Sequence, residues 1–161
     1  MREGVAVTIE IPLTRGYVTR IDDADEALTD GHKWWVFLRK NTGYARTRID
    51  GKLIMMHNLL APEWPQVDHA DGDGLNNCRY NLRDGTGFRN KANTRMRSDN
   101  TSGFKGVYHR GGKWRARIRV NGKLTCLGSF DSPEEAAYVY DQAAASCFGE
   151  YARTNAMLGL L

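Results

Sequence analysis

Residues 113–120 read KWRARIRV, an alternation of cationic and apolar side chains that decides the fold of the C-terminal part of the chain. A period of two is that of a β-strand, in which successive side chains point to opposite faces of the sheet. The two kinds of side chain therefore belong to opposite faces, Trp114, Ala116, Ile118 and Val120 on one and Lys113, Arg115, Arg117 and Arg119 on the other. We expect the apolar face to pack on a helix. The four like charges on the other face repel one another unless an anionic partner neutralises them.

Tight turns flank this strand on both sides. A Gly-Gly pair at 111–112 and an Asn-Gly pair at 121–122 favour the positive backbone angles of two-residue hairpin connections. Further strands are expected over residues 106–110 and 124–130. Together the three strands predict an antiparallel sheet in which each strand is joined to the next by a hairpin.

A helix is expected directly after the third strand. Ser132 is a capping residue, Pro133 suits the first helical position, and Glu134 and Glu135 complement the helix dipole in the first turn. Gly149 favours the C-terminal end of the helix. Mostly small side chains recur between these ends at helical spacing: Ala136, Ala137, Tyr140, Ala143, Ala144 and Cys147. This stripe predicts a helix that lies close against the sheet.

The N-terminal part reads as a series of further strands. Alternating or apolar runs bounded by turn residues predict strands over residues 5–11, 33–38, 43–49 and 52–57. Asp50 and Gly51 join the last two strands as a two-residue hairpin turn. The tryptophans Trp34, Trp35 and Trp64 are expected in the core of this part.

The organisation of the chain follows from a change in local composition. Residues 95–103 are polar and charged and have no periodicity, which marks a linker. A chain of 161 residues has room for two small domains. We therefore expect an α+β protein with a β-rich N-terminal domain over residues 1–96, a linker over 97–103 and a sheet-and-helix domain over 104–157.

Composition excludes several classes of protein. Although 41% of the residues are hydrophobic, no apolar run approaches the roughly 20 residues that span a bilayer, and no apolar signal region follows Met1. We expect a protein of the cytoplasm with no membrane partner. Cys78, Cys126 and Cys147 are odd in number and form no Cys-x-x-Cys pair, so they are expected to be free thiols.

The placement of charge is more informative than the net value of +4. Residues 89–123 contain eleven Lys and Arg residues and a single acid, Asp99. A local excess of positive charge of this size is typical of a surface that binds phosphates. Nucleic acid is the expected partner.

A candidate reaction centre lies just before this basic stretch. Residues 67–77 read VDHADGDGLNN, which places carboxylates, an imidazole and two amides in and around a Gly-rich loop. Hydrolysis of a phosphodiester needs a base for the attacking water and a positive centre for the developing negative charge. Asp68 and Asn90 offer oxygen ligands to Mg²⁺ or Mn²⁺, a neutral His69 is the candidate base, and Asn81 is expected to hold the His69 ring by a hydrogen bond.

The roles given to Asp68 and His69 require a particular backbone conformation at these two residues. Neighbours on a regular strand point to opposite faces, so Asp68 and His69 serve one phosphate only if the strand ends or twists there. The sequence Asp-Gly-Asp-Gly at 71–74 favours such an end.

Other interpretations of these residues are weaker. Asp-Gly and Asn-Asn pairs taken singly are most often turn formers. A calcium loop starting at Asp71 fails, because Leu75 occupies a ligand position and no glutamate closes the loop. Zinc held by His57, Cys78 and His69 is an alternative, but this spacing fits no closed site.

The C-terminal part carries several short motifs in a fixed order. They are FKGV at 104–107, KWRARI at 113–118, LGSF at 127–130, EEAA at 134–137, Tyr140-Asp141 and FGEYARTN at 148–155. In these motifs the chain resembles the Apetala/ethylene-response-factor type of DNA-binding domain. The resemblance implies a sheet that lies in the major groove of double-stranded DNA, with contacts from Lys105, Tyr108, Arg110, Arg115, Arg117, Arg119 and Thr125. The chain departs from the plant pattern at Tyr108, where arginine is usual, and at Cys126, where tryptophan is usual.

The first half resembles another family. Asp68-His69, Asn76-Asn77, Asn81-Leu82-Arg83 and Asn90 have the order and spacing of the phage HNH (His-Me finger) homing endonucleases. This resemblance implies a strand-strand-helix metal finger over about residues 53–95 and metal-dependent cutting of DNA, with the roles already given to Asp68, His69, Asn81 and Asn90. It also implies a monomer or weak dimer in the cytoplasm of a bacterial host, if the protein is phage-encoded. The alternative is a non-catalytic DNA-binding regulator with a degenerate nuclease fold.

Overall fold

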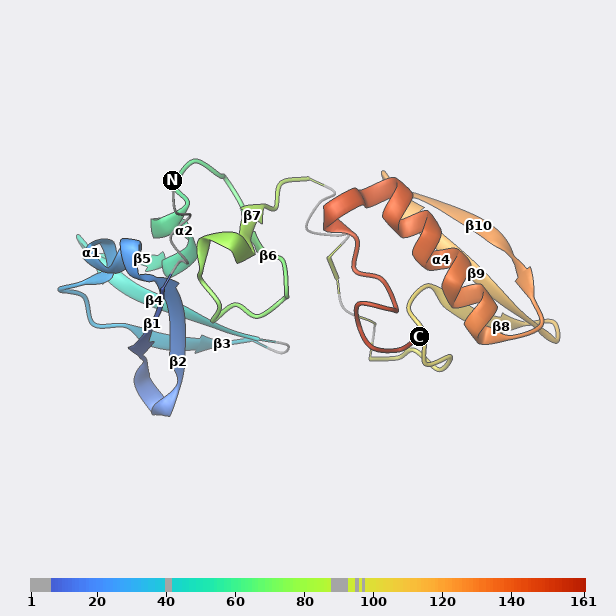
Figure 1. Ribbon diagram of the computed structural model, residues 1–161, viewed down its shortest axis with the longest axis horizontal. Helices are drawn as coiled ribbons and strands as arrows, with labels where there is room; N and C mark the ends of the chain where they lie inside the picture. The colour runs from blue at the N-terminus through green and yellow to red at the C-terminus, as the bar shows by residue number, and fades with distance from the viewer. Residues whose placement is uncertain (1–6, 40–41, 88–92, 95, 97) are drawn as a thin grey trace. The chain divides into compact units, whose positions relative to one another are not determined.

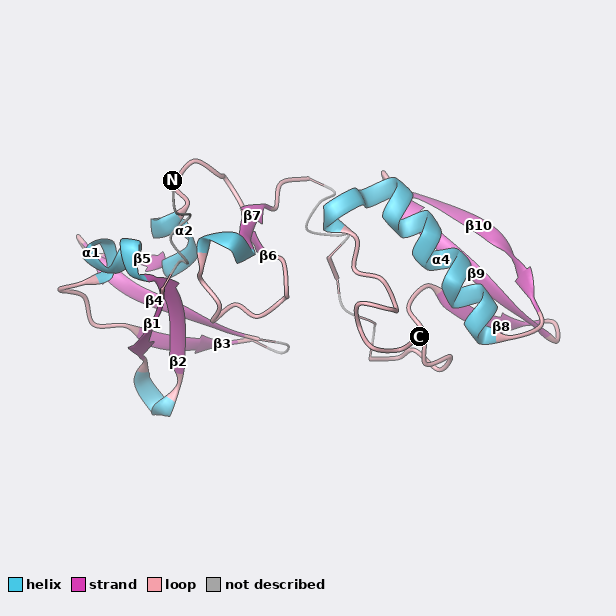
Figure 2. Cartoon of the chain, viewed as in Figure 1, coloured by secondary structure: helices cyan, strands magenta, loops and turns pink. Residues whose placement is uncertain are grey.

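The computed structural model divides into two compact units, Met1–Thr86 and Gly87–Leu161. It describes residues 7–39, 42–87, 93–94, 96 and 98–161 (Figure 1). Both units combine antiparallel sheets with helices (Figure 2), which confirms the predicted α+β class. The division at Thr86 precedes residue 96, the expected end of the N-terminal domain. No helix among the described residues is long and apolar enough to cross a membrane.

The described residues of the N-terminal unit form three groups of antiparallel strands. β1 (Thr8–Pro12) pairs with β2 (Val18–Asp22), β4 (Gly43–Ile49) lies between β3 (Trp35–Leu38) and β5 (Lys52–Met55), and β6 (Val67–His69) pairs with β7 (Leu82–Asp84). The helices of this unit are all short: η1 (Thr14–Gly16), η2 (Asp23–Asp25), α1 (Glu26–Thr29), α2 (Met56–Leu60) and η3 (Arg79–Asn81). The unit is therefore β-rich, as expected.

A strand is present in each of the four predicted N-terminal ranges, but the bounds differ: the strand predicted from residue 33 begins at Trp35, and the last one ends early. Asp50 and Gly51 have φ angles of 48° and 77°, which confirms the two-residue turn between β4 and β5. The last predicted strand ends at Met55 rather than at residue 57, because Met56 begins α2 and buries its side chain together with that of Leu60, one helical turn later. β2 and α1 were not predicted.

The core of the N-terminal unit lies on one face of the β3–β4–β5 sheet. Val36 and Ala45 pair across β3 and β4 and therefore share this face. Buried residues from other elements complete the cluster, among them Ile21, Trp34, Met56, Leu60 and Leu82. Trp34 belongs to the core, as predicted, whereas Trp35 lies on the opposite face and is only half-buried.

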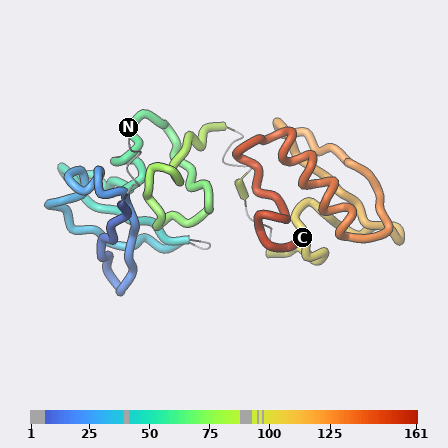
Figure 3. The backbone as a smooth tube through the Cα atoms, in the orientation of Figure 1, coloured from blue at the N-terminus to red at the C-terminus, as the bar shows by residue number. Residues whose placement is uncertain are grey.

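The C-terminal unit is a three-stranded antiparallel sheet packed on a helix. Its elements are β8 (Val107–Arg110), β9 (Lys113–Val120), β10 (Lys123–Phe130), α4 (Pro133–Phe148) and η4 (Gly149–Tyr151). β9 is the central strand, and α4 runs along one face of the sheet (Figure 3). Gly111, Gly112, Asn121 and Gly122 all have positive φ angles, which confirms both hairpin turns.

The two faces of β9 separate as the alternation predicted. Ala116 and Ile118 are buried against α4 residues such as Ala137 and Tyr140, whereas Arg117 and Arg119 are exposed. The helix starts as expected, since the Ser132 hydroxyl accepts a hydrogen bond from the Glu135 amide. The predicted small-residue stripe is wrong at its end: Cys147 is exposed, and Phe148 packs on the core in its place.

A buried asparagine holds the ends of the C-terminal unit together. Asn155 is fully buried, and its backbone and side-chain N–H groups donate to the Asp141 carboxylate of α4 at 2.7 and 2.8 Å. Its side-chain oxygen accepts from the Lys105 amide at 2.6 Å. The segment before β8 is also attached, since Asn100 donates to the Phe104 carbonyl. Described residues of the predicted linker therefore pack with the C-terminal unit.

The separation of the two β9 faces predicts two different effects of substitution. Ile118→Ala should lower the free energy of unfolding of the C-terminal unit by about 2–5 kcal/mol, because it removes buried apolar volume. Arg117→Gln should change it by less than about 1 kcal/mol, because the side chain is exposed. Chemical denaturation followed by tryptophan fluorescence measures both values. A larger loss from Arg117→Gln than from Ile118→Ala would contradict this assignment of the faces.

Candidate active site and nucleic-acid interface

The β6–β7 hairpin carries Asp68 and His69. The register places Asp68 opposite Arg83 and His69 opposite Leu82. Asp68 is 8% exposed, and its Oδ2 accepts a hydrogen bond from Nε of Arg83 at 3.0 Å and lies at ion-pair distance, 3.0 Å, from Nη2 of the same residue. β6 ends at His69, where the chain turns and the Gly72 amide donates to the His69 carbonyl. The expected end of the strand at this point is confirmed.

The ring of His69 is held by Asn77. His69 Nε2 lies 3.1 Å from Asn77 Oδ1, and Asn77 Nδ2 donates to Thr19 Oγ1 at 2.8 Å. Because Asn77 Oδ1 can only accept, this network assigns the proton of the neutral ring to Nε2. The lone pair of His69 is then on Nδ1.

The side chain of Asn81 has other hydrogen-bond partners than the predicted His69 ring. Its Nδ2 donates to Asp71 Oδ1 at 3.0 Å and to the Asn76 carbonyl at 2.7 Å, and its Oδ1 accepts from the Asp71 amide. The predicted hydrogen bond from Asn81 to the His69 ring is therefore wrong. Asn81 is buried inside the loop of residues 71–77 and provides hydrogen-bond partners for Asp71 and for the Asn76 carbonyl. The Asn76-Asn77 pair was visible in the sequence, but only the folded loop shows that Asn77 reaches the ring.

Three aromatic rings meet beside the loop. The ring centroids of His57 and His69 are 5.1 Å apart, and Tyr44 lies 5.6 Å from His57 and 5.9 Å from His69. Gly74 is required here, because a Cβ atom at this position would lie 2.4 Å from the Gly43 carbonyl oxygen and 2.6 Å from the Tyr44 ring. The sequence indicated His57 only as a possible zinc ligand and contained no signal for its contact with His69.

Both histidines favour the neutral form. Burial, and then the nearby His69, lower the pKa of His57 to about 4. Burial also lowers the pKa of His69, although the hydrogen bond to Asn77 and the carboxylates of Asp71, Asp68 and Asp73 act in the opposite direction. A neutral His69 is able to accept a proton at physiological pH.

Only part of the predicted metal site lies among the described residues. The buried carboxylate of Asp68 has the oxygen chemistry that Mg²⁺ and Mn²⁺ prefer, so this donor fits the expected ion. Asn90, the other predicted ligand, and the helix expected to carry it lie outside the described residues. Across the described ranges, no three His, Cys, Asp or Glu side chains form a metal-binding group, so the zinc alternative with His57, Cys78 and His69 finds no support.

The cationic face of the C-terminal sheet is built from β8 and β9. Tyr108 lies opposite Arg115, and Arg110 lies opposite Lys113, so they share one face. The guanidinium carbon of Arg117 lies 4.6 Å from the centre of the Tyr108 ring, an arrangement typical of a cation–π contact. Four of the predicted DNA-binding residues, Tyr108, Arg110, Arg115 and Arg117, are therefore side by side.

Two other predicted DNA-binding residues lie elsewhere. Thr125 pairs with Ile118 and so shares the helix side of the sheet, and the expectation that it shares the arginine face is wrong. Cys126 pairs with Arg117 and is one of the exposed third-strand residues on that face. Lys105 precedes β8, and its amine donates to the Arg153 carbonyl at 2.9 Å. Burial and the charge of Arg153 lower the pKa of Lys105 to about 8.

Relatives of the chain come from plants and from viruses. An ethylene-responsive transcription factor of Arabidopsis thaliana is 32% identical over 70% of the chain and 69% of that protein. An uncharacterized HNH endonuclease of Acanthamoeba polyphaga mimivirus is 33% identical over 77% of the chain and 67% of that protein. Protein 3.8 of Escherichia phage T7 is 32% identical over 57% of the chain and 77% of that protein. This identity and coverage relate the chain both to the family of the ethylene-responsive transcription factors and to that of the mimivirus HNH endonuclease.

The extent of the match differs among the plant relatives. The chain spans 36%, 58% and 69% of the length of three ethylene-responsive factors of Arabidopsis thaliana. No family model matches the chain. No solved structure matches it either.

The pKa of His57 predicts how the stability of the N-terminal unit depends on pH. Unfolded His57 binds a proton near pH 6.5 and folded His57 only near pH 4, so the free energy of unfolding should fall as pH falls through this window. The share of His57 in this loss should be at most about 3 kcal/mol. Urea unfolding at several pH values should give a shallower dependence for His57→Phe than for the unsubstituted protein. Equal pH dependence in the two proteins would contradict the prediction.

Proposed function

We propose that the protein is a metal-dependent DNA endonuclease of the HNH type, directed to its site by the C-terminal sheet. The observation that carries this proposal is the buried neutral imidazole of His69, held by Asn77 and adjacent in β6 to the buried carboxylate of Asp68. The similarity to the mimivirus protein, which is named an HNH endonuclease, supports it. The basic stretch that follows supplies the expected contacts to phosphates.

The reaction is hydrolysis of a phosphodiester bond. A water oxygen bonds to phosphorus and the bond from phosphorus to the 3′ oxygen breaks. His69 Nδ1 takes a proton from the water, because Nε2 already donates to Asn77. The 3′ oxygen takes a proton from solvent, which leaves a 3′-hydroxyl and a 5′-phosphate.

The other residues of the site position the base and the ion. Asp68 and Asn90 would hold Mg²⁺ or Mn²⁺, which supplies positive charge for the phosphate and the leaving oxygen. Asn81 maintains the loop, and Tyr44 and His57 pack on the His69 ring. A single copy of this site per chain fits a monomer or weak dimer that nicks one strand of double-stranded DNA.

A second function is a DNA-binding regulator that does not cut. Two observations favour it: several relatives are named as transcription factors, and the Asp68 carboxylate already has a cationic partner in Arg83. In that case the loop around His69 is a structural remnant. Cutting of DNA is the measurement that separates the two functions.

The first test is nicking of supercoiled plasmid with Mg²⁺, with and without a chelator. His69→Ala removes the base and should lower the rate by about 10²–10⁴-fold. Asp68→Ala should lower it similarly because a metal ligand is lost, and Asn90→Ala should be partly rescued by more metal. DNA affinity should change by no more than a few-fold in each case. His32→Ala, a histidine of the same unit that packs on Trp34, is the matched control and should cut normally.

The outcome of this test distinguishes the two functions. Unchanged nicking by His69→Ala would contradict the assignment of the base. Absence of chelator-sensitive nicking in the unsubstituted protein would favour the regulator.

The second test concerns the cationic sheet. Arg117→Gln and Arg119→Gln should each weaken DNA binding and reduce the slope of log affinity against log salt by about 0.9, the contribution of one neutralised phosphate. Arg15→Gln, which removes an exposed cation from the turn between β1 and β2, is the control and should leave the slope unchanged. Anisotropy titrations at several salt concentrations give these slopes. If all three variants have equal slopes, another surface holds the DNA.

A further inference from the structure

One face of the β3–β4–β5 sheet combines aromatic rings with arginines. Trp35 lies opposite Arg46 and Phe37 lies opposite Tyr44, so these four side chains share the face that points away from the core. Arg48 follows at the next position of that face on β4, and Arg39 follows β3. We refer to Trp35, Phe37, Arg39, Tyr44, Arg46 and Arg48 as the outer face.

Two arginines of the outer face, Arg39 and Arg46, lie over the Phe37 ring. The guanidinium carbon of Arg46 lies 4.4 Å from the centre of the Phe37 ring, and that of Arg39 lies 5.3 Å from it. Nε of Arg46 is buried and has no hydrogen-bond partner within the described part of the chain. A stacked guanidinium is restricted in orientation and keeps its outer N–H groups available for a phosphate.

These arginines differ from others in the same unit. Arg79 and Arg83 are ion-paired with Asp25 and Asp68, and Arg20 lies 3.6 Å from Asp73. Within the described ranges, no carboxylate lies at ion-pair distance from Arg39, Arg46 or Arg48. Six Lys or Arg residues stand in residues 33–56 against one acid, Asp50. The outer face therefore has a positive charge that no carboxylate among the described residues pairs with.

The outer face is continuous with the candidate active site through Tyr44. Tyr44 belongs to the outer face by its pairing with Phe37, and its ring packs against those of His57 and His69. A nucleic-acid strand on this face would therefore run toward the base. Aromatic rings interleaved with arginines are typical of surfaces that follow a nucleic-acid backbone.

We infer that the outer face is a second DNA-binding surface, which holds the sugar-phosphate backbone of the substrate strand next to the bond that is cut. Arg39 and Arg46 contact phosphates, and Phe37 holds both guanidinium groups in place. This surface acts in addition to the cationic face of β9. The inference rests on the proposed function only in that DNA is the substrate.

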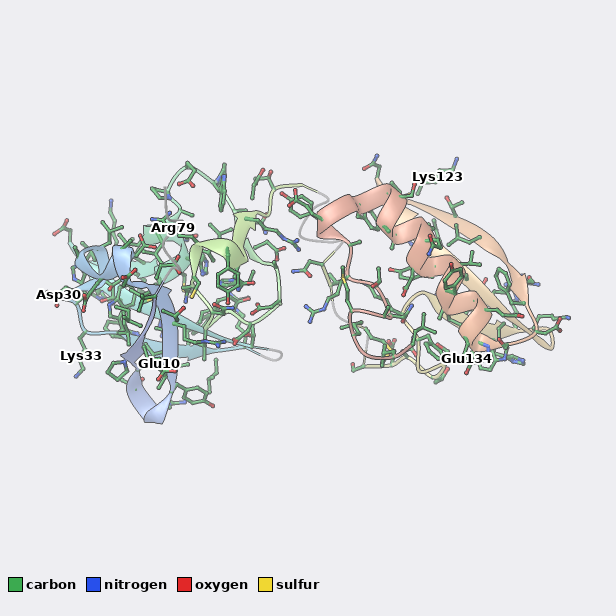
Figure 4. The ribbon with its side chains drawn as sticks, in the orientation of Figure 1. Glu10, Asp30, Lys33, Arg79, Lys123 and Glu134 are labelled. Atoms are coloured by element: carbon green, nitrogen blue, oxygen red, sulfur yellow. The ribbon has the colours of Figure 1, made fainter. Side chains whose placement is uncertain are left out.

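The test uses the full chain with His69→Ala, without divalent metal, so that binding is measured in the absence of cutting. Adding Arg39→Gln and Arg46→Gln should weaken binding to a labelled duplex roughly tenfold at low salt and make the log–log salt slope shallower by about 1.8. Lys33→Gln is the matched control. Lys33 lies in a hollow of the same unit with Glu10 and Asp30 (Figure 4), and its loss should change affinity by no more than about twofold. Equal slopes for the double variant and the control would overturn the inference.

A second measurement leaves the outer face unchanged and so does not depend on how the variants fold. Duplexes in which 5-iododeoxyuridine replaces thymidine throughout should form photo-crosslinks to peptides that contain Trp35, Phe37 or Tyr44. Crosslinks confined to residues 104–157 would overturn the inference even if the protein nicks DNA. Crosslinks to the outer face without any nicking would refute the proposed cutting and leave the second DNA-binding surface standing.

Discussion

The hydrogen bonds of the buried Asn77 side chain hold the candidate site together. Its amide nitrogen donates to Thr19 of β2 and its oxygen meets the His69 ring of β6, so one side chain connects two hairpins. The backbone reinforces this link, because the Asn77 amide donates to the Arg20 carbonyl and the Arg20 amide donates to the Leu75 carbonyl. Loss of the side-chain amide of Asn77 would leave buried polar groups without partners, at a cost of about 1–3 kcal/mol each. The orientation of the base therefore depends on the packing of the whole N-terminal unit.

A buried asparagine also connects distant segments in the C-terminal unit. Asn155 is fully buried, like Asn77, and connects Asp141 of α4 to the segment that leads into β8. In both units the side-chain amide of an asparagine donates through its nitrogen and accepts through its oxygen. It therefore forms hydrogen bonds with two segments that are distant in sequence. The hydrogen bonds of Asn77 and Asn155 hold the loops in place beside the sheets.

Charge is distributed in two ways across the protein. Arg79 and Arg83 of the N-terminal unit are paired with carboxylates and contribute to the fold. Arg46 and Arg117 instead lie over aromatic rings on sheet faces, where the guanidinium groups keep outward N–H groups for an external anion. The difference between an ion-paired and a ring-stacked arginine separates the structural cations from those that we assign to DNA.

The sequence by itself determined the local structure of most elements. Alternation along residues 43–49 and 113–120, the Asp-Gly and Asn-Gly turns, and the Ser132 cap are short-range signals, and all of them were confirmed. The register of the third C-terminal strand was also present in the sequence, since a two-residue turn at 121–122 places residue 125 opposite Ile118. The resemblance to the DNA-binding domain implied a DNA contact for Thr125, but this register places Thr125 on the helix side of the sheet.

Only the tertiary structure decided which polar side chains meet. Asn77 and Asn81 have the same chemistry and lie in the same loop region, and nothing local shows that one reaches His69 and the other Asp71. The contact of His57 with His69 depends on Met56 beginning a helix where its neighbours form a strand, a choice made by burial in the core. Periodicity specifies the face on which a side chain lies, whereas the partner on that face is set by the packing of segments far apart in the chain.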